Sequence, residues 1–565
     1  MKFICQLLAA LLLWLFIACN DQSGKSSSAD SESKQANTAD VMLVQPQAQP
    51  APAQPGSPAV IESKKLVVQD GSVDNDEVPP PPEAKEEEKP FNTEDYNNIV
   101  ENRFLAATQN PLSTFSIDVD EAAYSNVRRF INNGSIPPPG AVRIEEMINY
   151  FDYTYPQPQN DDPFTVNTEL SECPWSPQHR LVHIGLQGKE IPVQHLPNAN
   201  IVFLIDVSGS MQDENKLTLV KASMKLLADQ LRPDDKVAIV VYAGNAGLVL
   251  PPTSGTNKTA IKEAIDQLEA GGSTAGGEGI QLAYKVARDN FIKGGNNRII
   301  LATDGDFNVG LSSDDELVTL IEKERKSGIF LSVLGYGMGN YKDNKMQQLA
   351  DKGNGNHSYI DNINEARKVL VSEFASTLFT IAKDVKVQIE FNPAKVQAYR
   401  LIGYENRVLA AEDFNDDKKD AGELGSGHTV TALYEVIPVG VKSEFIANVD
   451  PLKYQPAKNS TATSGGDELM TIKLRYKKPD GDVSKLIVHP VTDSHLALAS
   501  TSDNFRFSAA VAAFGMLLRN SEFKQNASFQ QVISLAKGAK GADANGYRQE
   551  FITLVQAAGS LTAKK

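Results

Sequence analysis

The chain has 565 residues, which is enough for about three domains of ordinary size. Its 71 acidic residues outnumber 55 basic ones, so the formal net charge is −16, and no basic stripe with interleaved aromatic residues is present. This balance argues against nucleic acid as a partner, because phosphate backbones are bound by Lys and Arg.

The N-terminal residues have the pattern of a targeting segment. A short positive start is followed by an apolar run over residues 7–17. The ending Ala18-Cys19 resembles a bacterial lipobox, which implies a lipoprotein signal peptide over residues 1–19 and a lipid on Cys19. A secretory signal and a single spanning helix are the alternatives, although the run is short for a span. We expect a lipid-anchored protein of the bacterial cell envelope, in the periplasm or on the cell surface.

Residues 20–95 are low in complexity. Gln-Pro-Ala repeats lead into a proline run at 79–82 and a glutamate run at 86–88. Few apolar side chains are available to offset the entropy lost on ordering, so the composition predicts a disordered tether.

Residues 96–197 form the predicted N-terminal region. The expected elements are a strand over 113–120, helices over 121–131 and 144–151, and strands over 164–170 and 180–186. Asp118 and Asp120 lie just before the first helix. We interpret them as an N-terminal cap of this helix, with a second metal site as the alternative.

Residues 198–382 alternate between apolar strands and helical patterns. The expected strands cover 201–205, 237–242, 299–302 and 330–334. Apolar residues at helical spacing occupy 217–231 and 261–268 between them. Continuous apolar strands that alternate with helices predict the α/β class, with a doubly wound, mostly parallel sheet.

Oxygen-bearing side chains follow two of these strands. Asp206 ends the first strand, with Ser208 and Ser210 at alternate positions after it. Asp304 follows the third strand, and Thr274 begins a helical stretch. Ligands of doubly wound sheets bind outside the carboxyl ends of the strands, where these groups converge. Carboxylate and hydroxyl oxygens suit a hard cation, so the sequence predicts an Mg²⁺ (or Mn²⁺) site with incomplete coordination.

The order and spacing of these five residues resemble the metal-ion-dependent adhesion site of von Willebrand factor type A (VWA) domains, as in integrins. The resemblance implies a protein-binding module whose metal captures an exposed Asp or Glu of a protein partner. Glu278 departs from the small residue expected there. It lies four residues after Thr274, and we expect its side chain to point to solvent.

Residues 383–500 and 501–565 differ in character from the module. Alternating patterns predict strands of a β-sandwich-like domain over 385–391, 429–436 and 469–476. If the two strands before the module complete this sandwich, the module is an insertion into it. The last stretch predicts a C-terminal helical region. The acidic loop 413–423 has calcium-loop spacing, but Lys418 stands where an EF-hand needs Gly, which favours an acidic hairpin turn.

The regions around the module also resemble those of a group of bacterial VWA lipoproteins. The matching segments are 115–120, 124–130, 142–151, 427–434, 509–518 and 547–555. No nucleophile elbow, Walker loop or Cys/His cluster is present in the sequence, and the glycine-rich 335–339 lacks the order and the Lys of a phosphate loop. We therefore expect a membrane-anchored adhesion module that is not an enzyme. An envelope assembly or chaperone-like factor is the alternative, followed by a metal-dependent hydrolase.

Overall fold

The computed structural model describes residues 93–273, 276–305, 314–373, 379–446, 466–494 and 496–564. All of them belong to one unit of the chain, Glu87–Lys565. The predicted signal peptide and nearly all of the predicted tether lie outside the described residues. Within the described residues, no helix combines the length and the apolar character needed to cross a membrane.

The central module is built on a six-stranded sheet with the order β10-β9-β8-β5-β6-β7. Its strands are β5 (Ala199–Asp206), β6 (Lys236–Tyr242), β7 (Ala246–Ser254), β8 (Asn296–Thr303), β9 (Ile329–Tyr336) and β10 (His357–Ile360). All neighbours pair in parallel except β6 and β7. β5 and β8 are buried along their whole length, as expected for strands that are covered on both faces.

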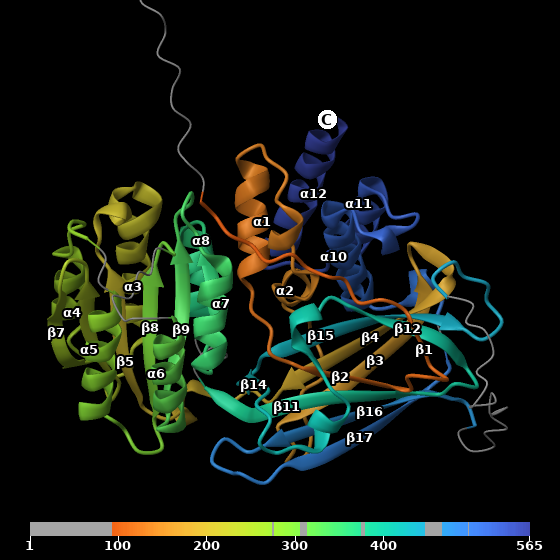
Figure 1. Ribbon diagram of the computed structural model, residues 1–565, viewed down its shortest axis with the longest axis horizontal. Helices are drawn as coiled ribbons and strands as arrows, with labels where there is room; N and C mark the ends of the chain where they lie inside the picture. Colours follow the sequence, from red (N-terminus) through yellow and green to blue (C-terminus); the bar gives the residue numbers. More distant parts are fainter. Residues whose placement is uncertain are drawn as a thin grey trace, which may run out of the picture. The chain divides into compact units, whose positions relative to one another are not determined.

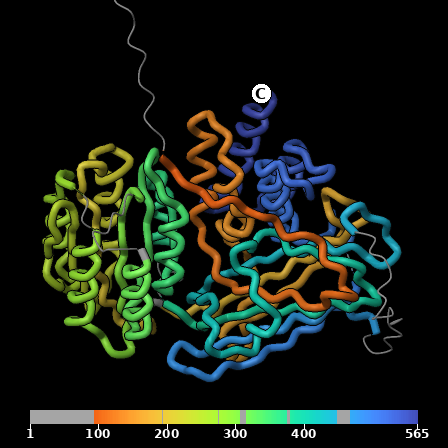
Figure 2. Tube along the Cα trace, viewed as in Figure 1, coloured from red at the N-terminus to blue at the C-terminus, as the bar shows by residue number. Residues whose placement is uncertain are grey.

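Helices cover both faces of this sheet (Figures 1 and 2). They are α3 (Leu219–Gln230), α4 (Lys258–Asp266), α5 (Gly276–Asp289), α6 (Asp314–Lys326), α7 (Asp343–Lys352) and α8 (Ile363–Arg367). The chain runs from β5 to β6 on one side, while β8 pairs with β5 on the other. The carboxyl ends of β5 and β8 therefore flank the point where the strand order reverses, which is the usual ligand position in such sheets.

Two antiparallel sheets form a separate sandwich, with the orders β1-β12-β15-β4-β3 and β13-β2-β11-β16-β17, and β14 pairs with β11. Before the module come β1 (Leu105–Ala106), β2 (Leu112–Ser116), β3 (Phe164–Cys173) and β4 (Ser176–Gly188). After it come β11 (Thr380–Phe391), β12 (Val396–Ile402), β13 (Val408–Leu409), β14 (Gly422–Gly425), β15 (Thr429–Pro438), β16 (Glu468–Lys477) and β17 (Lys485–Thr492). Because β4 pairs with β15, the α/β module is inserted into the sandwich.

Five helices from both ends of the described chain share one apolar cluster. They are α1 (Ala122–Asn132), α2 (Ile144–Asn149), α10 (Asp503–Arg519), α11 (Phe529–Gly538) and α12 (Tyr547–Ala563). α2 packs closely on α10, because a Cβ added at Gly515 would lie 2.7 Å from Cγ1 of Ile144. The predicted C-terminal helices thus pack on helices of the N-terminal region.

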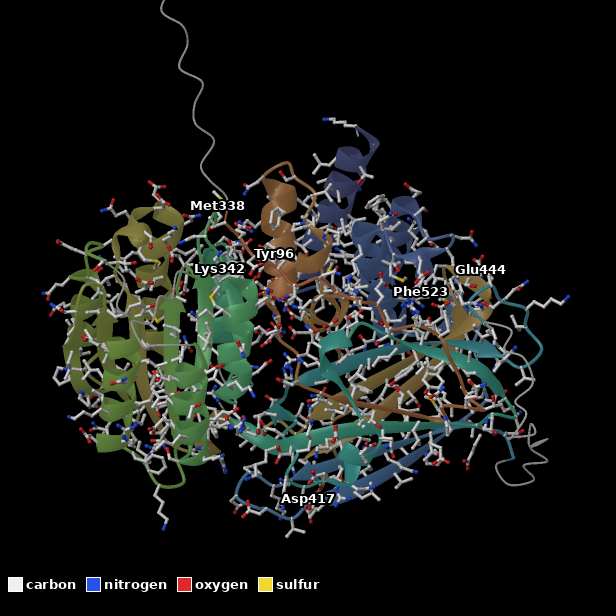
Figure 3. The ribbon with its side chains drawn as sticks, viewed as in Figure 1. Tyr96, Met338, Lys342, Asp417, Glu444 and Phe523 are labelled. Atoms are coloured by element: carbon white, nitrogen blue, oxygen red, sulfur yellow. The ribbon has the colours of Figure 1, made fainter. Side chains whose placement is uncertain are left out.

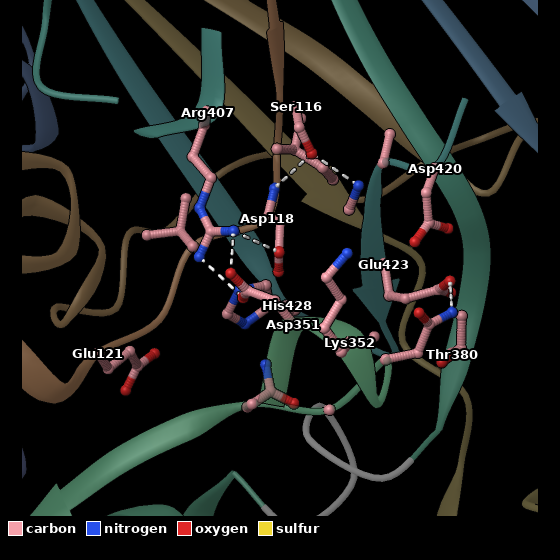
Figure 4. A pocket seen from close by; sticks show the side chains of 18 of the residues that line it. Ser116, Asp118, Glu121, Asp351, Lys352, Thr380, Arg407, Asp420, Glu423 and His428 are labelled. Carbon is pink, nitrogen blue, oxygen red and sulfur yellow. Dashed lines mark hydrogen bonds and ion pairs between the residues drawn. The ribbon is translucent and has the colours of Figure 1, made fainter. Parts of the chain in front are cut away.

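The interpretation of Asp118 and Asp120 as a helix cap is wrong. The residue that caps α1 is Glu121, and its side chain makes no capping hydrogen bond. The guanidinium of Arg407 instead donates to Asp118 at 2.9 Å and to Asp120 at 3.2 Å, and it also pairs with Asp351 of α7 at 2.8 Å. Figure 4 shows Asp118, Asp351 and Arg407 of this cluster in the wall of a cavity of about 280 Å³. Three carboxylates around the Arg407 guanidinium link the sandwich to the module.

The carboxylates of the acidic loop 413–423 pair with separate partners. Asp417, labelled in Figure 3, accepts from Arg475 at 3.2 Å and from Ser484 at 2.7 Å. Asp420 pairs with Arg325 of α6. These groups are held by different basic side chains. The loop is not the predicted hairpin turn, because the flanking strands β13 and β14 pair with β2 and β11.

Candidate metal centre

Asp206 is the last residue of β5, and its side chain is fully buried. Its Oδ1 accepts a hydrogen bond from the backbone N–H of Ser208 at 2.9 Å. Its Oδ2 accepts from the hydroxyl of Tyr242 at 3.1 Å and from that of Thr303 at 3.2 Å. Both oxygens are therefore oriented by groups at the ends of three adjacent strands.

Burial is the main reason why the pKa of Asp206 is raised to about 6. Hydrogen bonds from Ser208 and Tyr242 favour the charged form, whereas the negative charge of Asp304 disfavours it. The electrostatic influence of Asp304 agrees with the parallel pairing of β5 and β8. A cation between the two carboxylates would relieve both the repulsion and the cost of burial.

The loop after Asp206 brings two hydroxyls together. Ser208 Oγ and Ser210 Oγ lie 3.1 Å apart, within hydrogen-bond distance. The loop is joined to the segment before α5, because the backbone N–H of Gly209 donates to the carbonyl of Gly272 at 3.0 Å. Thr274, the predicted third hydroxyl ligand, lies outside the described residues. The described residues just before Thr274, Gly271 and Gly272, form backbone hydrogen bonds with the loop that follows Asp206.

Asp304 directly follows β8, and it is also fully buried. The next residue, Gly305, has φ of +98°, a backbone conformation that glycine adopts at little cost. A Cβ at this position would also clash with the backbone of Lys342. Burial alone would raise the pKa of Asp304. Hydrogen bonding with Asn340 and the charge of Lys216 outweigh burial and hold this pKa below its ordinary value.

Sequence reasoning missed three residues of this site. Tyr242 and Thr303 orient Asp206, and Lys216 Nζ lies 2.9 Å from Asp304 Oδ2. Tyr242 and Thr303 stand at the ends of predicted strands, so their position in the sequence could have indicated that they lie near the site. No sequence signal distinguishes Lys216 from a surface lysine at the start of a helix.

The arrangement fits a hard divalent cation. Its donors are two carboxylates and two hydroxyls at one edge of a parallel sheet, and oxygen donors suit Mg²⁺ and Mn²⁺. Among the described residues, no group of three or more His, Cys, Asp or Glu side chains could hold a metal ion. Glu278 is exposed, as predicted.

Family models match three consecutive parts of the chain. Residues 200–371 match the von Willebrand factor type A domain, residues 90–183 match a model described as von Willebrand factor, and residues 376–561 match the C-terminal part of the uncharacterized protein YfbK. The chain is thus a VWA-domain protein with additional regions on both sides of the domain. Domains of this type generally mediate protein–protein interactions and typically bind a divalent metal.

The match to YfbK extends over most of the chain. Uncharacterized protein YfbK of Escherichia coli (strain K12) is 46% identical over 474 residues, which cover 83% of this chain and 81% of that protein. The chain therefore belongs to the YfbK family.

Solved structures of two other proteins are similar to this chain. The von Willebrand factor type A protein from Catenulispora acidiphila has 14% identity and a TM-score of 0.37, over 80% of this chain and 91% of that one. The conserved hypothetical protein BatB from Bacteroides thetaiotaomicron has 24% identity and a TM-score of 0.28, over 31% of this chain and 97% of that one.

Proposed function

We propose that this protein is a lipid-anchored, metal-dependent binding module of the bacterial cell envelope. A single Mg²⁺ or Mn²⁺ is held by Asp206, Ser208, Ser210, Thr274 and Asp304, and it captures an acidic group of a protein partner. A lipid on Cys19 holds the chain at the membrane surface, in the periplasm or on the cell surface.

The observation that carries the proposal is the convergence of buried acids and paired hydroxyls at the carboxyl edge of the sheet. Asp206 and Asp304 follow adjacent parallel strands, and the hydroxyls of Ser208 and Ser210 lie 3.1 Å apart. If each of the five side chains binds through one oxygen, the octahedral shell of the ion is one ligand short and is completed by an exchangeable water. A partner's carboxylate replaces such a water and completes the coordination.

Partner capture tests this proposal. The full chain is immobilised and exposed to envelope extract in Mg²⁺ or in EDTA, and bound proteins are identified by mass spectrometry. The expected result is a specific partner that is retained in Mg²⁺, released by EDTA and not captured by Asp206→Asn. Exposed acidic residues of that partner are then replaced by amides, and one of these changes is expected to abolish capture.

Asp234→Asn is the matched control. Asp234 is exposed and lies just before β6, at the opposite end of the sheet from the site. It is expected to capture the partner as the wild type does. Partners that bind equally in EDTA and to Asp206→Asn would refute metal-dependent capture.

A further inference from the structure

Lys216 lies within the candidate metal centre. Its side chain is buried, and its Nζ donates to Asp304 Oδ2 at 2.9 Å and to the carbonyl of Ser210 at 3.0 Å. Asn340 Oδ1 accepts at 3.4 Å, and Asp213 Oδ2 lies 3.9 Å away. The ammonium thus bridges the two loops that supply oxygen atoms to the predicted cation site.

The glycine-rich segment 335–339 makes room for this lysine. Gly337 has φ of +72°, and a Cβ added there would lie 2.5 Å from Cε and 2.7 Å from Cγ of Lys216. Only a residue without a side chain lets the lysine stem pass this closely. One glycine of this segment thus packs against a charged side chain.

The same segment is fixed by the first described residues of the chain. The backbone N–H of Thr93 donates to the carbonyl of Gly339 at 2.7 Å, and the N–H of Gly339 donates to Glu94 at 2.8 Å. Figure 3 shows Tyr96 and Met338 at this edge of the module. The loop that packs against Lys216 is therefore held in place from a second side.

An ammonium and a divalent cation compete for the same carboxylate. Both are positive, so a metal ion coordinated by Asp304 repels Lys216 Nζ at its present position. We propose that Lys216 is a tethered competitor of the metal, which occupies Asp304 in the metal-free protein and leaves it when the metal binds. This inference rests on the proposed function and adds that metal affinity is set below the value that the oxygen ligands alone would give.

The test is the affinity of the full chain for Mn²⁺, measured by electron paramagnetic resonance of the free ion. Lys216→Met keeps the length of the stem and removes the charge. It is expected to bind Mn²⁺ about 10- to 100-fold more tightly, the equivalent of one hydrogen bond to a charged group. Lys225→Met is the matched control, because Lys225 lies on α3 and pairs with Asp266. Its affinity is expected to equal that of the wild type.

Gly337→Ala provides a second variant that retains the lysine. Its new Cβ displaces the Lys216 stem, so it is expected to raise Mn²⁺ affinity as well. If the wild type binds Mn²⁺ and both variants bind it equally or more weakly, competition by Lys216 is refuted and the metal site stands. If neither the wild type nor the variants bind Mn²⁺, the proposed function is refuted together with this inference.

Discussion

Glu145 is a buried acid whose charge should make the stability of the protein depend on pH. It lies in the first turn of α2 with 3% of its surface exposed, and its Oε2 has no hydrogen-bond partner among the described residues. Burial is the main reason why its pKa is raised to about 7 from 4.5, and the charge of Glu405 adds to this. Arg519 opposes the increase.

The sign and size of the effect follow from linkage. A carboxyl whose pKa is higher in the folded state stabilises the fold below its unfolded pKa, and this contribution is lost as pH rises towards the folded pKa. From pH 4.5 to pH 7, ionisation of Glu145 therefore lowers the free energy of unfolding by about 3 kcal/mol. Glu145→Gln removes the ionisation. The variant is expected to match the wild type most closely at pH 4.5 and to be more stable by about 3 kcal/mol at pH 8.

Urea denaturation at several pH values measures this difference. Fluorescence of Trp175 is a suitable probe, because it is buried in the same apolar cluster as α2. Glu172→Gln, the same change at an exposed position, is the matched control and is expected to have little effect at either pH. A stability difference between Glu145→Gln and the wild type that is constant from pH 4.5 to pH 8 would show that folding does not raise the pKa of Glu145.

Three further changes test the packing around the site. Arg143→Met leaves two buried carboxylates, one of them Asp343 of α7, without their cation, and should lower the free energy of unfolding by about 3–5 kcal/mol. Tyr242→Phe removes a hydrogen bond to Asp206 and should weaken Mn²⁺ binding about 10- to 100-fold in titrations. Gly279→Ala places a Cβ 2.7 Å from Tyr242 Cβ and should cost about 1–3 kcal/mol in urea denaturation.

Each of these expectations has an outcome that contradicts it. Wild-type stability of Arg143→Met would mean that the ion pairs of Arg143 with Glu146 and with Asp343 contribute nothing to the fold. Unchanged Mn²⁺ affinity in Tyr242→Phe would mean that Asp206 needs no orientation by its neighbour. Wild-type stability of Gly279→Ala would mean that α5 and β6 can separate at little cost.

Periodicity predicted the strands of the module that are buried on both faces. Residues 201–205 and 299–302 are uninterrupted apolar runs, and they lie within β5 and β8. β7 was missed, because this edge strand is half exposed and contains two prolines, and so lacks both the apolar run and the regular alternation. Alternation also predicted β11, β15 and β16 of the sandwich, and strand-like runs predicted β3 and β4 before the module, whereas β12 and β17 were missed.

The chemistry of the site was only partly readable from the sequence. Asp206 and Asp304 stand out because each follows an apolar strand, and parallel pairing brings them to one edge. Asp118 and Asp120 look like a helix cap by local rules, but their partner Arg407 is almost 290 residues away in the chain. The role of Lys216 could not be predicted for the same reason, because its partner Asp304 lies 88 residues later in the chain.

Isothermal titration calorimetry with Mg²⁺ and Mn²⁺ measures whether the carboxyl edge of β5 and β8 holds a divalent cation. We expect the wild type and Asp234→Asn each to bind a single ion per chain. Asp206→Asn, whose fold is checked by its urea denaturation, is expected to bind none at the same concentrations. Equal binding by Asp206→Asn and the wild type, or no binding by either of them, would contradict the assignment of the metal to the carboxyl edge of β5 and β8.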